Sequence, residues 1–312
     1  MVLLSVFVFF VEIIIPQGTN TLFIYFLLTD YFFTPTNLTQ PAVSQHIHFL
    51  EQTYGVELFA HNGKRMELTR AGEILKRSAL TMKHDEFHMQ EKMRHAAGGV
   101  QNYAFGATLS VAEFMITEDL ERFILNHPES HIRMEVANTK ELLVKLDAGE
   151  LDFAIVEGEF PKDEYEYLLY SQEEYVAAGN KKVAERFRGV SIKDLFTERI
   201  ILREPGSGTR EILENELKRR GLQVSDFANL TEIGNIGVIQ KMLQAGLGVT
   251  FFYQATIKGK EELQVIQLND FKLRHDIMFI YRKNSIFEKD YRQIYEEFRE
   301  NGKMAREGKF PK

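Results

Sequence analysis

The chain has 312 residues, of which 44% are hydrophobic and 27% are charged, and its formal net charge is −7. This length predicts about two domains, and the composition is ordinary for a globular protein. The sequence contains no cysteine, which excludes disulfides, thiolate zinc sites and cysteine nucleophiles.

The acidity lies mainly in the C-terminal part. Residues 37–97 hold 8 Lys/Arg and 7 Asp/Glu, whereas residues 98–312 hold 30 Lys/Arg and 36 Asp/Glu. The N-terminal part is therefore only weakly basic, and any affinity for DNA would depend on placed contacts and two-fold repetition rather than on bulk charge.

The first 36 residues contain two apolar runs, Met1–Ile15 and Thr21–Phe33, and no Lys or Arg. A signal peptide does not fit, because there is no basic n-region and no small-residue cleavage site. A membrane anchor fits poorly, since each run is shorter than about 18 apolar residues, and we expect no stable membrane association. A divergent first helix is a further interpretation. We favour a segment translated out of frame or from a wrong start, joined to the rest at about Asn37.

A helix is predicted from Thr39 to Gly55. Thr39 fits an N-cap, Pro41 suits the first turn, and Gly55 suits the end of a helix. Apolar residues recur at intervals of four, three and four on one face, namely Val43, Ile47, Leu50 and Tyr54. The opposite face carries uncharged donors and acceptors that can meet base edges and phosphates, namely Gln40, Ser44, Gln45 and His48.

This stretch resembles the winged helix-turn-helix of the LysR-type transcriptional regulators. The matching segments are Leu38-Thr39-Gln40-Pro41-Ala42-Val43-Ser44-Gln45, Ile47-x-x-Leu50-Glu51, Gly55-x-x-Leu58-Phe59 and Leu68-Thr69-x-x-Gly72. The resemblance implies that residues 37–70 are a partial winged helix-turn-helix. The Phe-x-x-Ala-Ala-x-x-Leu helix that the family has before it is not visible in residues 1–36. The DNA contacts that the resemblance implies are Thr39, Gln40, Pro41, Ser44, Gln45, His48, Lys64 and Arg65.

A long amphipathic helix is predicted from Arg70 to about Ala97, and Gly98-Gly99 marks its end. The resemblance implies that residues 71–98 form a linker helix that pairs with a second copy of the chain. His84 and His88 are four residues apart and could hold a metal ion in principle. We interpret them as solvated side chains and expect no metal site.

Beyond residue 98, predicted strands alternate with predicted helices, which favours parallel βαβ units. The predicted strands are Tyr103–Ala107, His131–Val136, Asp152–Glu157, Ile200–Arg203, Leu230–Ile233, Gly248–Phe252 and His275–Tyr281. The predicted helices are Val111–Asn126, Thr139–Ala148, Thr209–Arg220, Asn235–Ala245 and Phe287–Glu300.

Residues 99–300 resemble the effector-binding domain of the same family, through segments such as Leu151-Asp152-Phe153-Ala154-Ile155 and Arg203-Glu204-Pro205-Gly206-Ser207-Gly208-Thr209-Arg210. The resemblance implies an α/β fold of two Rossmann-like subdomains, the type 2 periplasmic-binding-protein fold. Subdomain I would use residues 101–170 and 275–300, and subdomain II residues 171–274. Two chain crossings near Ser171 and Arg274 would form the hinge, and residues 301–312 would form a tail.

Small polar residues stand where predicted strands give way to helices, the edge at which open α/β sheets bind ligands. Helix N-termini there can hold anions without Lys or Arg, so we expect a small, possibly anionic effector. The predicted effector-binding residues are Thr108, Ser110, Thr139, Ser207, Thr209 and Asn235. Each of them could instead be a plain helix cap. Gly206-Ser207-Gly208-Thr209 lacks the Gly-Lys-Ser/Thr ending of a phosphate loop, and we expect no cofactor.

The leading hypothesis is a cytoplasmic, effector-responsive regulator that binds two-fold-related promoter DNA as a homodimer or homotetramer. The alternative is a solute-binding or sensor protein that uses only the C-terminal fold. It would require export and would leave residues 37–97 without a purpose. An enzyme on the same scaffold is the third hypothesis. The sequence contains no His-Glu-x-x-His or Gly-x-Ser-x-Gly motif, which argues against it.

Overall fold

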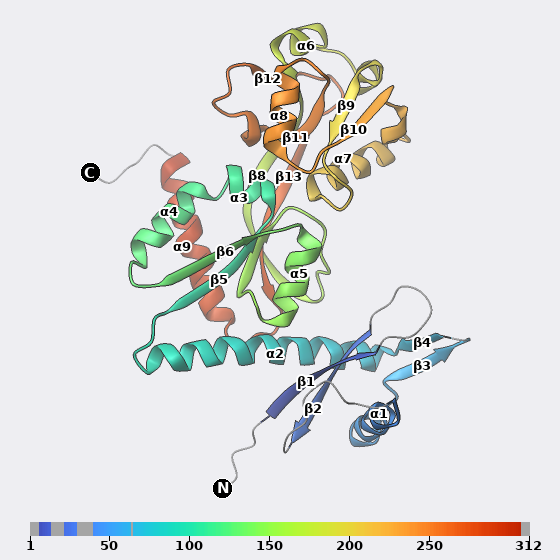
Figure 1. Cartoon of the computed structure of the whole chain (residues 1–312), viewed down its shortest axis with the longest axis vertical. Coiled ribbons are helices and arrows are strands. Elements are labelled where there is room, and N and C mark those ends of the chain that lie inside the picture. The colour runs from blue at the N-terminus through green and yellow to red at the C-terminus, as the bar shows by residue number, and fades with distance from the viewer. Residues whose placement is uncertain (1–5, 14–21, 30–39, 64, 307–312) are drawn as a thin grey trace.

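The structure, a computed structural model, describes residues 6–13, 22–29, 40–63 and 65–306. Figure 1 shows a small N-terminal part, a long helix α2, and a two-lobed C-terminal region that stands on the side of α2. Among the described residues, none of the helices combines the length and the apolar character needed to cross a membrane.

Two strands lie in the apolar runs at the N-terminus. β1 (Val6–Ile13) and β2 (Leu22–Thr29) pair antiparallel, with Val6 opposite Thr29, and both approach α2. The runs are rich in Val, Ile, Phe and Tyr, which favour strands. The interpretation as a divergent first helix is therefore wrong for these residues. That residues 1–36 are foreign to the family stays a prediction.

The segment that resembles a winged helix-turn-helix consists of α1 (Gln40–Tyr54) and the hairpin of β3 (Phe59–Asn62) and β4 (Arg65–Leu68). The predicted helix is confirmed, and it ends at Gly55, whose φ is +67°. Tyr54 was predicted to lie on the apolar face of this helix, but its side chain is 51% exposed. The Glu51 carboxylate accepts a hydrogen bond from the Leu58 amide at 2.8 Å, so the chain folds back beside Glu51 and leaves Tyr54 outside. Thr39, the predicted N-cap, lies outside the described residues.

The long amphipathic helix predicted from Arg70 to about Ala97 is confirmed as α2 (Arg70–Ala96). The Thr69 hydroxyl caps it by accepting from the Gly72 amide at 3.1 Å, and the chain leaves it at Gly98 with a φ of +89°. A Cβ at Gly72 would lie 2.2 Å from the Leu58 carbonyl oxygen. Glycine at this position therefore lets α2 begin directly against the turn that follows α1.

The C-terminal region is a mixed α/β structure of two lobes. Lobe I, residues 101–170 and 278–306, contains β5 (Asn102–Ala107), α3 (Leu109–Phe114), α4 (Thr117–Asn126), β6 (His131–Val136), α5 (Thr139–Ala148), β7 (Phe153–Val156) and α9 (Glu288–Arg306). Lobe II, residues 171–277, contains α6 (Lys181–Arg186), η1 (Ile192–Thr197), β9 (Arg199–Leu202), α7 (Gly208–Arg219), η2 (Val224–Asp226), β10 (Asn229–Glu232), α8 (Ile236–Gln244), β11 (Thr250–Tyr253), η3 (Gln254–Ile257) and β12 (Leu263–Ile266).

Two long antiparallel strands, β8 (Tyr165–Asn180) and β13 (Leu273–Arg282), cross from one lobe to the other. Their register shifts between Ile277 and Met278, opposite Tyr170. One crossing lies at the predicted Ser171, and the other lies slightly beyond the predicted Arg274. The sheet order β11-β8-β13-β7-β5-β6 therefore joins both lobes through one backbone ladder.

Two expectations need correction. The helix predicted over Val111–Asn126 is two helices, because the chain breaks at Met115 and turns Ile116, fully buried, into the core. The strands are also not all parallel. β5 pairs with β6 and β7 in parallel, and β9 pairs with β10 in parallel, but β8 pairs antiparallel with three neighbours.

Candidate functional site: a DNA-facing helix, an inter-lobe cleft and the linker between them

The polar face predicted on α1 is exposed. Ser44, Gln45 and His48 all lie at the surface, and His48 Nε2 is 2.9 Å from the Gln52 side-chain nitrogen. An exposed helix with uncharged donors and acceptors has the shape and chemistry to enter a major groove. Thr39 and Lys64 lie outside the described residues, as do the side chains of Gln40, Pro41 and Arg65.

A cavity of about 240 Å³ lies between the lobes. Lobe I supplies the ends of β5, β6 and β7 with the start of α5, and lobe II supplies the loop from β9 into α7. Its lining residues are Thr108, Leu109, Val136, Ala137, Asn138, Glu141, Glu157, Arg203, Glu204, Ser207 and Gly208. The cavity is therefore at the carboxyl ends of strands, where open α/β sheets bind ligands.

Glu157, directly after β7, is the centre of a buried polar cluster. Its Oε1 accepts hydrogen bonds from Ser110 Oγ at 3.4 Å and from Thr209 Oγ1 at 3.2 Å. Thr209 belongs to α7, so this contact joins the two lobes. Burial raises the pKa of Glu157 to about 7, and the hydrogen bonds and the charge of Arg203 offset that effect only in part. The nearby Tyr253 hydroxyl also lowers the pKa of Glu157. The same hydroxyl lies 3.2 Å from His275 Nδ1, within hydrogen-bond distance.

Several buried polar atoms at this cleft have no hydrogen-bond partner among the described residues. They are Thr108 Oγ1, Thr139 Oγ1, Glu157 Oε2 and Arg203 Nη1. Arg203 uses Nε and Nη2 for a bidentate pair with Glu204, both at 2.8 Å, which leaves Nη1 over. Buried polar groups normally find partners, so these four atoms are places at the cleft where a further hydrogen-bond partner could be added.

The six predicted effector residues differ in their surroundings. Thr108 and Ser207 line the cavity, and Ser110 and Thr209 hold Glu157 behind it. Thr139 is buried next to Gly158, where a Cβ would lie 2.6 Å from its hydroxyl oxygen. The cap of α5 is Asn138, whose Oδ1 accepts from the Glu141 amide at 2.9 Å, so Thr139 is not the cap.

Asn235 has no place in this cluster. It is exposed, it is not among the residues that line the cavity, and its Oδ1 caps α8 by accepting from the Val238 amide at 3.0 Å. The sequence reasoning also passed over Glu157 and Arg203. Both directly follow a buried apolar strand, which is the signal that singled out the hydroxyl residues.

Helix α2 docks on lobe I through a polar face. His84 and His88, predicted to be solvated, are only 1% and 7% exposed, so that prediction is wrong. His84 Nε2 is 3.2 Å from the Leu151 carbonyl oxygen, and His88 Nδ1 is 3.0 Å from Asp152 Oδ1. Leu151 and Asp152, directly before β7, cover these two side chains.

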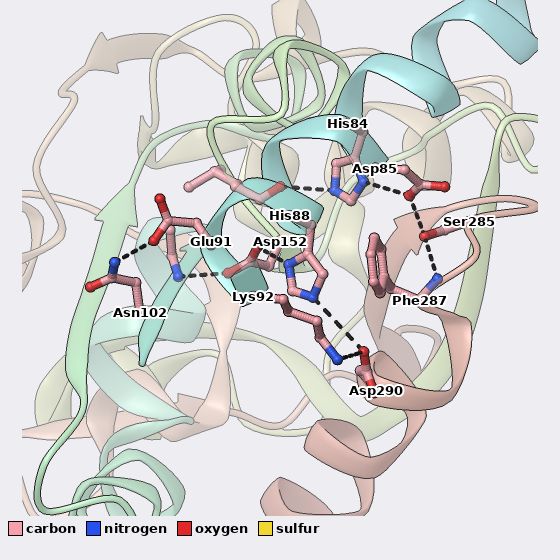
Figure 2. A network of polar contacts seen from close by, with 12 residues as sticks. His84, Asp85, His88, Glu91, Lys92, Asn102, Asp152, Ser285, Phe287 and Asp290 are labelled. Carbon is pink, nitrogen blue, oxygen red and sulfur yellow. Dashed lines mark hydrogen bonds and ion pairs between the residues drawn. The ribbon is translucent and has the colours of Figure 1, made fainter. Parts of the chain in front are cut away.

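Figure 2 shows that the network continues from His84 through Asp85 to the loop before α9. Asp85 accepts hydrogen bonds from Ser285 Oγ and from the Ile286 amide, the latter at 2.9 Å. Burial acts to raise the pKa of Asp85, but hydrogen bonds from His84, Ser285 and the Ile286 amide outweigh it and keep this pKa below its usual value. On the same side, Lys92 forms an ion pair with Asp290 of α9. The linker helix is thus fixed to the end of lobe I away from the cleft.

Two protein families match different parts of the chain. Residues 101–303 match the family described as LysR substrate binding domain, and residues 36–73 match the bacterial regulatory helix-turn-helix protein, lysR family. A probable RuBisCO transcriptional regulator of Cyanidium caldarium is 25% identical over 240 residues, which is 75% of each chain. The HTH-type transcriptional regulator CysL of Bacillus subtilis is 25% identical over 253 residues, 78% of this chain and 82% of that protein.

Solved structures share the fold. The regulatory domain of CcmR from Synechocystis PCC6803, in complex with 2-PG, has a TM-score of 0.56 at 21% identity and covers 64% of this chain and 99% of that chain. A C206 mutant of OxyR from Corynebacterium glutamicum has a TM-score of 0.58 at 19% identity, with 88% of each chain covered.

Proposed function

This chain belongs to the LysR family of bacterial regulatory helix-turn-helix proteins, and we propose that it binds promoter DNA sequence-specifically under the control of a small molecule. The small molecule would occupy the cleft between the lobes. The observation that carries the proposal is the buried polar set at that cleft, Thr108, Thr139, Glu157 and Arg203, in which each residue has an atom without a partner in the described structure. Such atoms are costly unless a ligand pairs with them.

The DNA contacts of this regulator would come from the exposed polar face of α1 and from the hairpin of β3 and β4. We place Ser44, Gln45 and His48 at base edges or phosphates, together with Thr39, Gln40, Pro41, Lys64 and Arg65 from the resemblance of the motif. The protein would act in the cytoplasm as a homodimer or homotetramer, because a two-fold repeat raises the affinity of a weakly basic module.

The effector signal would pass through the two strands that join the lobes and through the docked helix α2. A ligand that binds both sides of the cleft favours one arrangement of the lobes, and it can shift DNA binding only by its difference in affinity for the two arrangements. The residues at the cleft do not support the enzyme hypothesis in particular, because ligand binding by a regulator accounts for them without a reaction.

The DNA contacts are tested by fluorescence anisotropy with a duplex from the region upstream of the gene and with a random duplex. Gln45→Ala is expected to weaken binding to the upstream duplex by about 1–3 kcal/mol, with a smaller loss on random DNA. Thr53→Ala, at the other end of α1, is the matched control and should leave both affinities unchanged. Equal losses on both duplexes would remove Gln45 from base readout.

A further inference from the structure

The polar atoms left over at the cleft are of two opposite kinds. Glu157 Oε2 is an acceptor when the carboxyl is ionised, and Arg203 Nη1 is a permanently charged donor. Glu157 is 3% exposed, and the side chain of Arg203 is 10% exposed. When Glu157 is ionised, a ligand that satisfies both atoms offers a donor on one side and an acceptor on the other.

The charges around the cavity do not suit a purely anionic ligand. Its lining includes three carboxylates, Glu141, Glu157 and Glu204, and one guanidinium, Arg203. Glu204 already pairs with that guanidinium through two hydrogen bonds. An oxyanion alone would therefore lie close to Glu157 and would share the Arg203 guanidinium with Glu204, which is unfavourable in a buried site when Glu157 is ionised.

The first turn of α7 offers an attractive position for an anion at one end of the cavity. The first turn of α7 begins at Gly208, and the Ser207 side chain makes no capping hydrogen bond there. Helix N-termini bind anions through free amides and partial positive charge. A Cβ at Gly208 would lie 2.8 Å from Glu157 Cγ, so this anion position and the Glu157 carboxyl lie side by side.

We propose that the cleft binds a small dipolar metabolite of the amino-acid class. Its ammonium group contacts Glu157 Oε2, and its carboxylate lies at Arg203 Nη1 and the first turn of α7. An α-amino acid carries these two groups on one carbon atom, which matches the closeness of Glu157 and Gly208. This inference rests on the proposed effector function of the cleft, and it replaces the expectation of a simple anion.

The test is a thermal-shift screen of the full chain against the standard amino acids and, for each, the matched 2-hydroxy acid that lacks the ammonium group. We expect at least one amino acid to raise the melting temperature by about 5 °C at saturation, while its 2-hydroxy counterpart does not. Stabilisation by hydroxy acids alone, or by neither set, would overturn the proposal.

The stabilising amino acid is then titrated by calorimetry at pH 7 in buffers of different ionisation enthalpy. An ammonium group on Glu157 favours the ionised carboxyl, so binding should release up to about half a proton from a group with a pKa near 7. An oxyanion at the same place would take protons up. Uptake, or no proton exchange, would contradict the placement of the ammonium group.

Glu157→Gln keeps the shape of the side chain and removes its charge. It should reduce the affinity for the amino acid about ten-fold or more and abolish the proton release. Glu113→Gln, an exposed acid on the neighbouring helix α3, should change neither. Unchanged affinity in Glu157→Gln would overturn the proposal. DNA binding without ligand is measured in parallel, and its absence in the wild type would count against the proposed function rather than against the ligand class.

Discussion

Ionisation of the buried Glu157 carboxyl destabilises the fold, and this effect depends on pH. Its pKa is about 7 in the folded chain, against 4.5 when unperturbed, so the folded state holds this proton more tightly than the unfolded state does. The protonated Glu157 carboxyl therefore makes its full contribution to the free energy of unfolding below about pH 4.5, and this contribution is lost as the pH rises through about 7. At pH 8 this loss amounts to about 3 kcal/mol, from the difference between the two pKa values.

Glu157→Gln should remove that dependence. The free energy of unfolding of the wild type, measured by urea denaturation, is expected to fall between pH 5 and pH 8 by about 2–3 kcal/mol more than that of Glu157→Gln. Glu113→Gln serves as the control and should follow the wild type. If Glu157→Gln showed the same dependence as the wild type, this carboxyl would not be the group that titrates.

At the scale of the element, helix α2 has two faces with different partners. Its polar face, with His84, Asp85 and His88, is buried on lobe I. Asp85→Asn keeps the volume but places an amide where two donors point, the Ser285 hydroxyl and the Ile286 amide. We expect a loss of about 1.5–3 kcal/mol, typical of hydrogen bonds to a buried charged group.

The measurement for this variant is hydrogen exchange along α2, together with urea denaturation. Faster exchange should be confined to the docked part of α2 and to the loop before α9. Glu73→Gln, whose side chain pairs with Lys76 at 4.0 Å at the surface, is the control and should be neutral within about 0.5 kcal/mol. Identical exchange in Asp85→Asn and wild type would mean that the network does not hold the helix.

The other face of α2 is apolar and exposed. Ile74, Met82, Met89 and Met93 are between 42% and 57% exposed and recur at intervals of eight, seven and four. A stripe with this spacing is typical of helices that pair with another helix. The linker helix is thus suited to pair with a second copy, as the resemblance implies.

The double variant Met82→Asp, Met89→Asp should therefore prevent association, because it would place carboxylates in an apolar contact. In sedimentation velocity at one protein concentration, the wild type is expected as a dimer or larger and the double variant as a monomer. Lys272→Asp, an exposed residue of lobe II, is the control. A wild type and a double variant that sediment alike would exclude this face as the interface.

The sequence predicted those elements that local patterns determine. The helix Gln40–Tyr54, the long helix α2 and most βα units follow from caps, glycines and apolar periodicity, whereas the wing is implied only by the resemblance of the motif. It missed β8, because charged residues such as Glu173 and Glu174 interrupt the apolar pattern of a strand that is paired on both edges. It misplaced His84 and His88 because their burial depends on Leu151 and Asp152, far along the chain.

For the site, the rule that polar residues follow strands found Thr108 and Thr139 but not Glu157 or Arg203. Hydroxyl residues were chosen because helix N-termini attract anions. The carboxyl and the guanidinium were passed over because their burial and their leftover atoms depend on contact between the lobes. Asn235 shows the opposite error. It was predicted to bind the effector because it opens a helix after a strand, but its side chain only caps α8.

At the scale of the whole molecule, the parts form one chain of contacts from the DNA-facing helix to the cleft. Helix α1 and the wing lie at one end of α2, lobe I rests along its side, and lobe II carries the far wall of the cavity (Figure 1). This arrangement separates DNA binding from ligand binding. A change at the cleft should alter the response to ligand more than it alters the basal affinity for DNA.

Selection of bound duplexes from a randomised DNA pool by the full chain tests the central claim most directly. The account predicts enrichment of one sequence element, repeated with two-fold symmetry, as a pair of α1 helices related by the linker would read it. Gln45→Ala should weaken or change the enriched element. Recovery of unenriched, random duplexes by the wild type, at a salt concentration where non-specific binding is weak, would contradict the assignment of this chain as a sequence-specific regulator.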